Sequence, residues 1–113
     1  MDCLFCKIAA GEIPAKIVLE TDEVVAFHDI NPQAPVHVLV IPKKHIAKVS
    51  DMTEDDIELM GKVIYAGKKV AEQLGIAEDG FRLVFNNGRM GGQHVYHIHL
   101  HVLGGRAMLW PPG

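Results

Sequence analysis

A run of alternating histidine and apolar residues near the end of the chain constrains the fold most. Residues 97–102 read His-Ile-His-Leu-His-Val, so three histidines alternate with three apolar residues. In a β-strand, successive side chains point to opposite faces, whereas in an α-helix His99 would face away from His97 and His101. The pattern therefore predicts a strand that turns three imidazoles to one face and three apolar side chains to a core.

A row of imidazoles is suited to bind either a metal ion or a phosphate group. A catalytic metal needs three ligands that converge at about 2.0–2.1 Å, and a third histidine on one strand can hardly join the first two. No Asp or Glu lies between Gly80 and Gly113 to complete such a set. Imidazole is also a competent nucleophile at phosphorus and a hydrogen-bond donor to phosphoryl oxygens. The phosphate interpretation is favoured, with mixed protonation of the three rings expected near pH 7.

Size and charge exclude several classes of protein. The 113 residues correspond to one domain, and the net charge of −3 leaves no basic face for extended nucleic-acid binding. The apolar runs are too short to span a bilayer, and no signal peptide is visible, so we expect a cytoplasmic protein without a membrane partner. In a reducing compartment, Cys3 and Cys6 suggest metal binding or plain burial before a disulfide.

The remaining patterns predict an α+β domain with about five mainly antiparallel strands, one long helix packed on a face and a short N-terminal helix. The expected elements are a helix over 3–10, strands over 16–20, 24–28 and 36–41, a helix from a Thr53 cap to Gly75, a strand over 81–85, and the histidine strand.

A glycine-rich loop precedes the histidine strand. Gly88, Gly91 and Gly92 would allow the backbone to aim N–H groups at an anion, with Asn86 and Gln93 as polar partners. Taken alone, the same loop would be interpreted as a flexible hairpin connection; its place beside the histidines favours the functional interpretation.

The histidine segment 97–103 resembles the histidine triad (HIT) superfamily. Segments 27–37, 40–45 and 103–113, the last ending in Trp-Pro-Pro-Gly, are similar to its Hint branch, in the bacterial form. The resemblance implies a single HIT domain over 1–113, with the tail 104–113 near the active site, and a homodimer that joins two sheets edge to edge. It also implies hydrolysis of purine nucleoside 5′-phosphoramidates (AMP-amine, AMP-lysine) and acyl-adenylates.

The resemblance assigns a role to each matching residue. His99 would be the nucleophile that forms a nucleotidyl-histidine, which water then cleaves. His97 would hold the His99 ring through its backbone carbonyl, and His101, with His37 behind it, would contact the phosphate and assist the leaving group. The nucleotide-binding set would be Asp29 on the ribose hydroxyls, Phe27, Ile30 and Ile13 around the base, and Asn86, Gly92 and Gln93 at the phosphate end. Without the resemblance, Asp29 would be interpreted as a turn residue, and Phe27 and Ile30 as core.

Two features depart from the best-known Hint pattern. His94 stands where many members have Ser, which leaves the leaving-group preference open; it is equally interpreted as an exposed residue at the strand entry. Cys3 and Cys6 resemble a pair that some bacterial relatives use with two histidines to hold zinc, and His45 and His97 would complete that Cys2His2 site. The alternative is two small buried side chains. We expect no cofactor to be required for catalysis.

Two other functions stay open. One is a nucleotide-binding or signalling module whose hydrolysis is incidental, and the other is a dinucleoside polyphosphate hydrolase. His101 speaks against the nucleotidyl transferases of the superfamily, which usually have Gln at that position. Both AMP and GMP derivatives fit an apolar slot with a ribose carboxylate, so the base preference is not decided.

Overall fold

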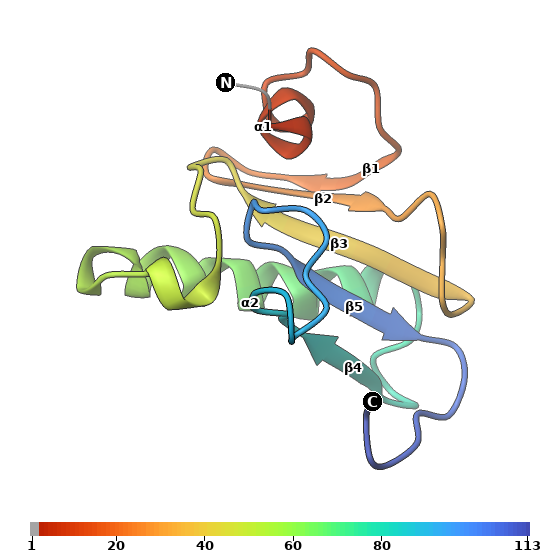
Figure 1. Cartoon of the computed structure of the whole chain (residues 1–113). Coiled ribbons are helices and arrows are strands. Elements are labelled where there is room, and N and C mark those ends of the chain that lie inside the picture. The colour runs from red at the N-terminus through yellow and green to blue at the C-terminus, as the bar shows by residue number, and fades with distance from the viewer. Residues whose placement is uncertain (1–2) are drawn as a thin grey trace.

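A five-stranded antiparallel sheet organises residues 3–113, the part of the chain that the computed structural model describes (Figure 1). The spatial order is β1-β2-β3-β5-β4, which leaves β1 and β4 as edge strands. The strands are β1 (Ile17–Glu20), β2 (Val24–His28), β3 (Val36–Pro42), β4 (Phe81–Val84) and β5 (Leu100–Gly104); the helices are α1 (Leu4–Ala9) and α2 (Ile57–Gln73), with 3-10 turns at Val49–Asp51 and Glu54–Asp56. The expected α+β architecture is confirmed, and only the turn at 49–51 has no counterpart in the sequence prediction.

Both faces of the sheet are covered, because the two helices lie on opposite sides of it. In β2, Val24 and Ala26 belong to the apolar cluster under α2, whereas Val25 and Phe27 belong to a second cluster under α1. All four side chains are at most 4 % exposed. A strand buried on both faces is a continuous apolar run, which explains why residues 24–27 of β2 show no polar alternation before the exposed His28.

The long helix α2 approaches the sheet closely at Gly67. A Cβ atom at this position would lie 2.8 Å from Cδ2 of Leu100 in β5, so the absence of a side chain lets the helix lie directly on the strand. The helix is preceded by Thr53, as expected, whose N–H donates to the Asp56 carboxylate at 3.0 Å. Lys44 donates to the same carboxylate at 2.7 Å and ties the loop after β3 to the start of α2.

The histidine strand is shorter than predicted, because only His101 lies within the hydrogen-bonded ladder. β5 pairs with β3 from Gly104 back to Leu100, which lies opposite Val40, and continuing the same register by two residues would place Ile98 opposite Pro42. Proline has no N–H to donate, so the ladder ends there. The N–H of Ile98 donates instead to the carbonyl of Ile46 at 2.7 Å. The face alternation nevertheless holds, since Ile98 is buried in the cluster under α2.

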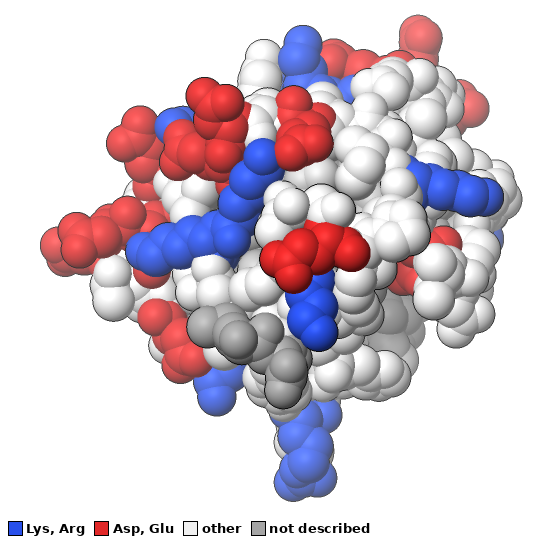
Figure 2. Space-filling view, turned by 90° about the horizontal axis from the view of Figure 1, so that it is seen from above, with Lys and Arg blue, Asp and Glu red and all other residues white. Residues whose placement is uncertain are grey.

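Acidic and basic side chains interleave on the face shown in Figure 2. Two ion pairs connect elements that are distant in sequence: Lys43 with Glu20 at 2.7 Å, and Lys62 with Glu23 at 2.6 Å. Within residues 3–113, no helix combines the length and apolarity needed to cross a membrane.

The close approach at the end of β5 can be tested by substitution. A Cβ at Gly104 would lie 3.0 Å from Cβ of the buried Ile76, so we expect Gly104→Ala to lower the free energy of unfolding by about 1–3 kcal/mol. A Cβ at Gly61 in α2 would have no heavy atom within 4 Å, and Gly61→Ala should raise the free energy of unfolding by roughly 0.4–1 kcal/mol. Urea denaturation measures both values. Equal effects of the two substitutions would contradict the packing derived for Gly104.

Candidate active site and metal centre

The three histidines of the alternating segment enter two different groups of side chains. His99 and His101 lie together, with ring centroids 4.9 Å apart, and His37 from β3 stacks beside His101 at 5.2 Å. The His97 ring lies instead beside His45, at 5.1 Å between centroids. The predicted row of three imidazoles is thus divided between a histidine cluster and a cysteine–histidine cluster.

Hydrogen bonds assign the position of the ring proton on His37 and His101. The backbone N–H of Gln33 donates to Nδ1 of His37 at 3.0 Å, so a neutral His37 carries its hydrogen on Nε2. That Nε2 lies 2.9 Å from Nδ1 of His101, to which it donates. His101 then carries its own hydrogen on Nε2, which is buried and has no partner within residues 3–113. A buried donor of this kind is expected to meet an acceptor when a ligand binds.

The ring of His99 is oriented in the opposite sense. Its Nδ1 lies 2.8 Å from the carbonyl oxygen of His97, which can only accept, so Nδ1 carries the hydrogen and Nε2 keeps a free electron pair. The edge of Phe5 packs against this ring at 5.2 Å between centroids. The site therefore holds an imidazole with a free lone pair next to an imidazole with a free N–H.

All three rings of the histidine cluster are neutral at pH 7. Burial lowers the pKa of His101 to about 4, with further lowering by His99 and His37. Burial is also the main reason why the pKa values of His37 and His99 lie below the ordinary value. The expected mixture of charged and neutral rings is therefore wrong, because burial disfavours every charged form. The rings differ in which nitrogen carries the proton.

A carboxylate joins this cluster from a part of the chain that the prediction had not considered for a metal or proton site. Asp29 follows β2, and its Oδ2 lies 3.4 Å from Nε2 of His37. Its Oδ1 accepts the N–H of Asn31 at 2.8 Å, which is the turn contact expected from the sequence. One oxygen thus fixes the turn, and the other faces the histidines.

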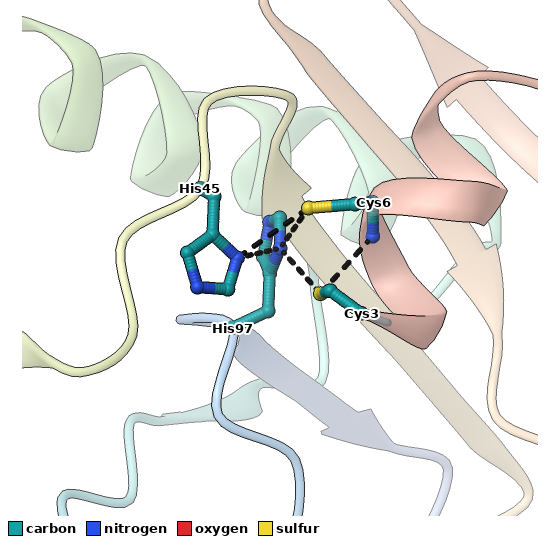
Figure 3. Close-up of side chains that lie close together, drawn as sticks. All are labelled: Cys3, Cys6, His45 and His97. Carbon is teal, nitrogen blue, oxygen red and sulfur yellow. Dashed lines mark hydrogen bonds between the residues drawn. The ribbon is translucent and has the colours of Figure 1, made fainter. Parts of the chain in front are cut away.

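The second cluster consists of Cys3, Cys6, His45 and His97, whose donor atoms converge (Figure 3). The Nδ1 atoms of the two histidines are 3.3 Å apart, and the sulfur-to-Nδ1 distances are 3.3 Å for Cys3–His97, 3.4 Å for Cys6–His45 and 3.5 Å for Cys6–His97. Bond lengths of about 2.3 Å to sulfur and 2.0–2.1 Å to nitrogen place the ligand atoms of a tetrahedral zinc about 3.3–3.8 Å apart. The donor atoms match this spacing.

The ring nitrogen of His97 that points away from the cluster, Nε2, is hydrogen-bonded as in a metal-binding histidine. Its Nε2 lies 2.7 Å from the carbonyl oxygen of Pro42 and donates to it, so Nδ1 presents a lone pair to the cluster. Burial raises the pKa of the Cys6 thiol, whereas a bound zinc would stabilise the thiolate. The residues present therefore fit a structural zinc ion of the Cys2His2 type.

Asp29, His37 and His101 also lie close enough together to suggest a metal site, but they do not fit one. His37 accepts the Gln33 N–H on Nδ1, so a metal on its Nε2 would leave the ring without any proton. Metal-bound histidines instead donate their outer N–H. Of the two groups, only the cysteine–histidine cluster has the hydrogen bonding of a metal site.

The glycine-rich loop uses its own N–H groups. Gly92 donates to Arg89 and Gln93 donates to Gly88, both at 3.1 Å, while the Gly88 N–H donates to the Gln93 side chain at 2.9 Å. The Gln93 amide donates to Ala47 at 2.7 Å as well. These N–H groups are turned into the loop and away from the anion-cradling role expected of them. Nucleotide contacts of Gly92 and Gln93 stay a prediction.

The other predicted binding residues occupy varied positions. Phe27 is buried and packs edge-on against Phe5, at 5.4 Å between centroids. Ile13 is half-buried, whereas the Ile30 side chain is fully exposed, at 101 %. His94 is exposed too, and it adds a small contribution to the burial that lowers the pKa of His99. The base slot and the role of His94 stay predictions.

A groove of about 400 Å³ opens beside His37 and His101, and Asn86 lines it. Residues of the C-terminal tail line the same groove, and Arg82 in β4 donates to the carbonyl of Leu109 at 2.8 Å. The tail thus lies near the histidine cluster of its own chain.

Sequence reasoning missed four residues that hold the site: Phe5, Gln33, Pro42 and Arg106. Two of them, Gln33 and Pro42, act through backbone groups, to which side-chain patterns give no signal. Arg106 acts through its side chain: its guanidinium donates twice to the carbonyl of Gln33, at 3.1 and 3.3 Å, and so supports the residue whose N–H sets the His37 tautomer. For Phe5, the position between two cysteines on one helix turn was a signal available in the sequence.

Comparisons with known proteins agree with this geometry. A family model described as the HIT domain matches residues 10–108. An uncharacterised HIT-like protein of Synechocystis is 55 % identical over 112 residues, covering 99 % of this chain and 97 % of that protein. Adenylylsulfatase HINT1 of Arabidopsis thaliana is 51 % identical, covering 97 % of this chain and 76 % of the relative. The crystal structure of a HIT family hydrolase from Legionella pneumophila superposes with a TM-score of 0.97 at 59 % identity, over 99 % of this chain and all of that one. The chain belongs to the HIT domain family.

Proposed function

We propose that this protein hydrolyses purine nucleoside 5′-phosphoramidates and acyl-adenylates through a covalent nucleotidyl intermediate on His99. The observation that carries the proposal is the pairing of the His99 lone pair with the unpartnered His101 N–H, on rings 4.9 Å apart. Two relatives support the broader class of nucleotide hydrolase, since one is named an adenylylsulfatase and the other a HIT family hydrolase.

In the first step, Nε2 of His99 attacks the α-phosphorus while the bond from phosphorus to the leaving amine or acyl oxygen breaks. Nε2 of His101 hydrogen-bonds to the leaving atom and relays to a leaving amine a proton taken up from solvent, so that His101 stays neutral; an acyl carboxylate leaves without a proton. The nucleotidylated His99 ring is then cationic, with phosphorus on Nε2 and hydrogen on Nδ1. The carbonyl of His97, 2.8 Å from Nδ1, stabilises that charge.

In the second step, water attacks the phosphorus and the bond to Nε2 breaks. One proton of this water is released to solvent through His101, which keeps the tautomer set by His37 and the Gln33 N–H. His99 returns to its neutral form with the hydrogen still on Nδ1. Both steps thus leave the proton positions as they were found.

The remaining predicted residues would bind the nucleotide around this centre. Asp29 has one oxygen committed to the turn, and the other would accept from the ribose hydroxyls. The full exposure of Ile30 fits a side chain that packs against a planar base. Phe27 and Ile13 would complete the slot, and Asn86 would face the phosphate.

The two alternative functions make different demands on the site. A binding module would need no tautomer order, so the arrangement of His99 and His101 favours turnover. A dinucleoside polyphosphate hydrolase would use the same two rings, and the similarity to an adenylylsulfatase favours smaller leaving groups.

Substitution of the nucleophile tests the proposal. We expect His99→Ala to reduce the hydrolysis of an adenosine 5′-phosphoramidate with a fluorogenic amine by several orders of magnitude, because no other free ring lone pair faces the cluster. His28→Ala alters an exposed histidine of β2 and serves as the matched control, with unchanged kcat/KM. A folded wild-type protein that binds AMP but cleaves none of these substrates would contradict the proposal and support the binding module.

The depressed pKa of His101 predicts how stability depends on pH. The ring titrates near 4 when folded and near 6.5 when unfolded, so the unfolded chain binds more protons between these values. Stability must then fall as the pH drops from about 6.5 to 4, by at most about 3 kcal/mol from this residue. We expect His101→Gln to flatten that part of the curve of unfolding free energy against pH. Parallel curves for wild type and His101→Gln would refute the assigned pKa direction.

We also propose that the protein forms a homodimer through the exposed edge of β4. This strand has one free edge and a half-exposed Leu83, and the nearby helix α2 exposes Ile64 and Tyr65. An apolar, unpaired edge favours pairing with a second copy. Leu83→Lys should convert the dimer to a monomer in sedimentation-velocity experiments. Ile17→Lys, on the opposite edge strand β1, should leave the dimer intact; dissociation by Ile17→Lys alone would place the interface at β1.

A further inference from the structure

Both ring nitrogens and the carbonyl of His97 have polar contacts, and each contact is with a different part of the site. Its Nδ1 faces the cysteine–histidine cluster, its Nε2 donates to the carbonyl of Pro42 at 2.7 Å, and its carbonyl accepts from Nδ1 of His99 at 2.8 Å. The His97 side chain is fully buried. The residue therefore connects the cluster directly to the ring of His99.

The backbone around His97 and His99 lacks the support of a β-ladder. β5 begins only at Leu100, and the Ile98 N–H is bound to the carbonyl of Ile46, which follows the cluster residue His45. The His97 carbonyl and the Ile98 N–H belong to one planar peptide unit, so the position of this carbonyl depends on the segment at residues 45–46 and on the side-chain contacts of His97. The contacts of His45 with Cys6 and His97 in the cysteine–histidine cluster hold that segment in place.

A second connection runs through helix α1. This helix has only six residues, which is too short to be stable alone, so its position depends on tertiary contacts. Cys3 and Cys6 bring it into the cluster, and Phe5 between them packs its edge against the His99 ring at 5.2 Å between centroids and against Phe27 at 5.4 Å. Two separate contacts of the His99 ring are thus built on residues of the cluster or their direct neighbours.

We propose that Cys3, Cys6 and His45, with a metal ion bound, are positioning residues for the nucleophile, because they fix the His97 carbonyl and the Phe5 edge between which the His99 ring is held. This inference rests on the proposed function of His99. A metal ion of the zinc class supplies the fixed tetrahedral geometry that links α1, the loop after β3 and the segment before β5 (Figure 3). The reacting atoms remain those of His99 and His101.

This role differs from simple stabilisation in what it predicts. Loss of the cluster geometry leaves the groups predicted to bind the nucleotide, such as Asp29, in place, but lets the His99 ring turn. The rate of the chemical step should therefore fall while nucleotide affinity stays the same. A misplacement of about 1 Å can cost a reaction about a hundredfold in rate, so we expect a loss of about 10- to 100-fold.

The experiment compares three forms of the full-length protein: zinc-loaded wild type, His45→Ala and His45→Cys. His45→Cys retains four ligands as a Cys3His site, and its metal content is checked by mass spectrometry. We measure the single-turnover rate with an adenosine phosphoramidate, the Kd for AMP, and the ring ¹⁵N chemical shifts of His99, which report the nitrogen that carries the proton. His45→Ala should lose metal, lose rate about 10- to 100-fold, keep its AMP affinity and show averaged His99 ring signals, while His45→Cys should retain the wild-type values.

Two further variants separate positioning from loss of stability. Val63→Ala in α2 removes buried methyl groups from the apolar cluster under α2, on the opposite face of the sheet from Cys3 and Phe5, and it should lower stability without changing the rate or the His99 signals. If His45→Ala does not fold, Phe5→Leu takes its place, because it keeps all four ligands and removes the aromatic edge that packs against His99 and Phe27; a reduced rate with altered His99 ring signals is expected.

The outcomes distinguish this inference from the proposed function. If zinc-loaded wild type hydrolyses the substrate and metal-free His45→Ala does so at the same rate with the same His99 signals, positioning by the cluster is overturned while the function stands. An unchanged rate for Phe5→Leu overturns it in the same way where that variant is used. If zinc-loaded wild type with intact His99 signals cleaves nothing, the proposed function fails first.

Discussion

The hydrogen bond from His97 Nε2 to the carbonyl of Pro42 is the contact on which the rest of the site depends. Pro42 ends the ladder between β3 and β5, because it has no N–H for the strand that would continue opposite it. Its carbonyl nevertheless remains free to accept. By accepting from Nε2, it forces the lone pair of His97 to Nδ1, where the cysteines and His45 lie. Pro42 thus ends the ladder between β3 and β5, and its carbonyl directs the His97 lone pair toward the cysteine–histidine cluster.

The same principle distinguishes the two histidine groups. Each group contains imidazoles close to other ligand atoms, and proximity alone would make both of them metal sites. The partner of the outer nitrogen separates them: a carbonyl receives a proton from His97, whereas an N–H gives one to His37. The first arrangement leaves a lone pair on Nδ1 of His97, which can bind a cation. In the second, His37 donates to Nδ1 of His101, so His101 carries its hydrogen on Nε2, where it can bind an anion. The Pro42 carbonyl therefore prepares His97 to bind a cation, whereas the Gln33 N–H prepares His37 and His101 to bind an anion.

Burial explains why this division rests on tautomers. The ring of His101 lies 4.9 Å from that of His99 and 5.2 Å from that of His37, so three charged imidazoles would repel, and burial lowers the pKa of each ring further. Neutral rings avoid both costs and can still present a donor at one position and an acceptor at the next. His101, with its pKa near 4, is the ring for which this matters most, because its N–H must persist at neutral pH without a positive charge.

Sequence patterns predicted the elements well where apolar periodicity and strong turn residues coincide, as in β2 and α2. They failed at residues 97–99, because a side-chain alternation of two indicates an extended backbone but not whether a partner strand is hydrogen-bonded to it.

The site residues were found by residue type, since histidine, cysteine and aspartate carry the chemistry. Their grouping was not predictable from the chain, because it depends on backbone groups of Gln33 and Pro42 that any residue type can provide. That His97 belongs to the cysteine cluster and yet orients His99 follows only from three-dimensional contacts: the residue lies on a bent, unpaired segment whose side chain and carbonyl point to different partners. Because β5 begins only after His99, the side chains that hold residues 97–99 in place of ladder hydrogen bonds also determine the geometry of the His99 ring.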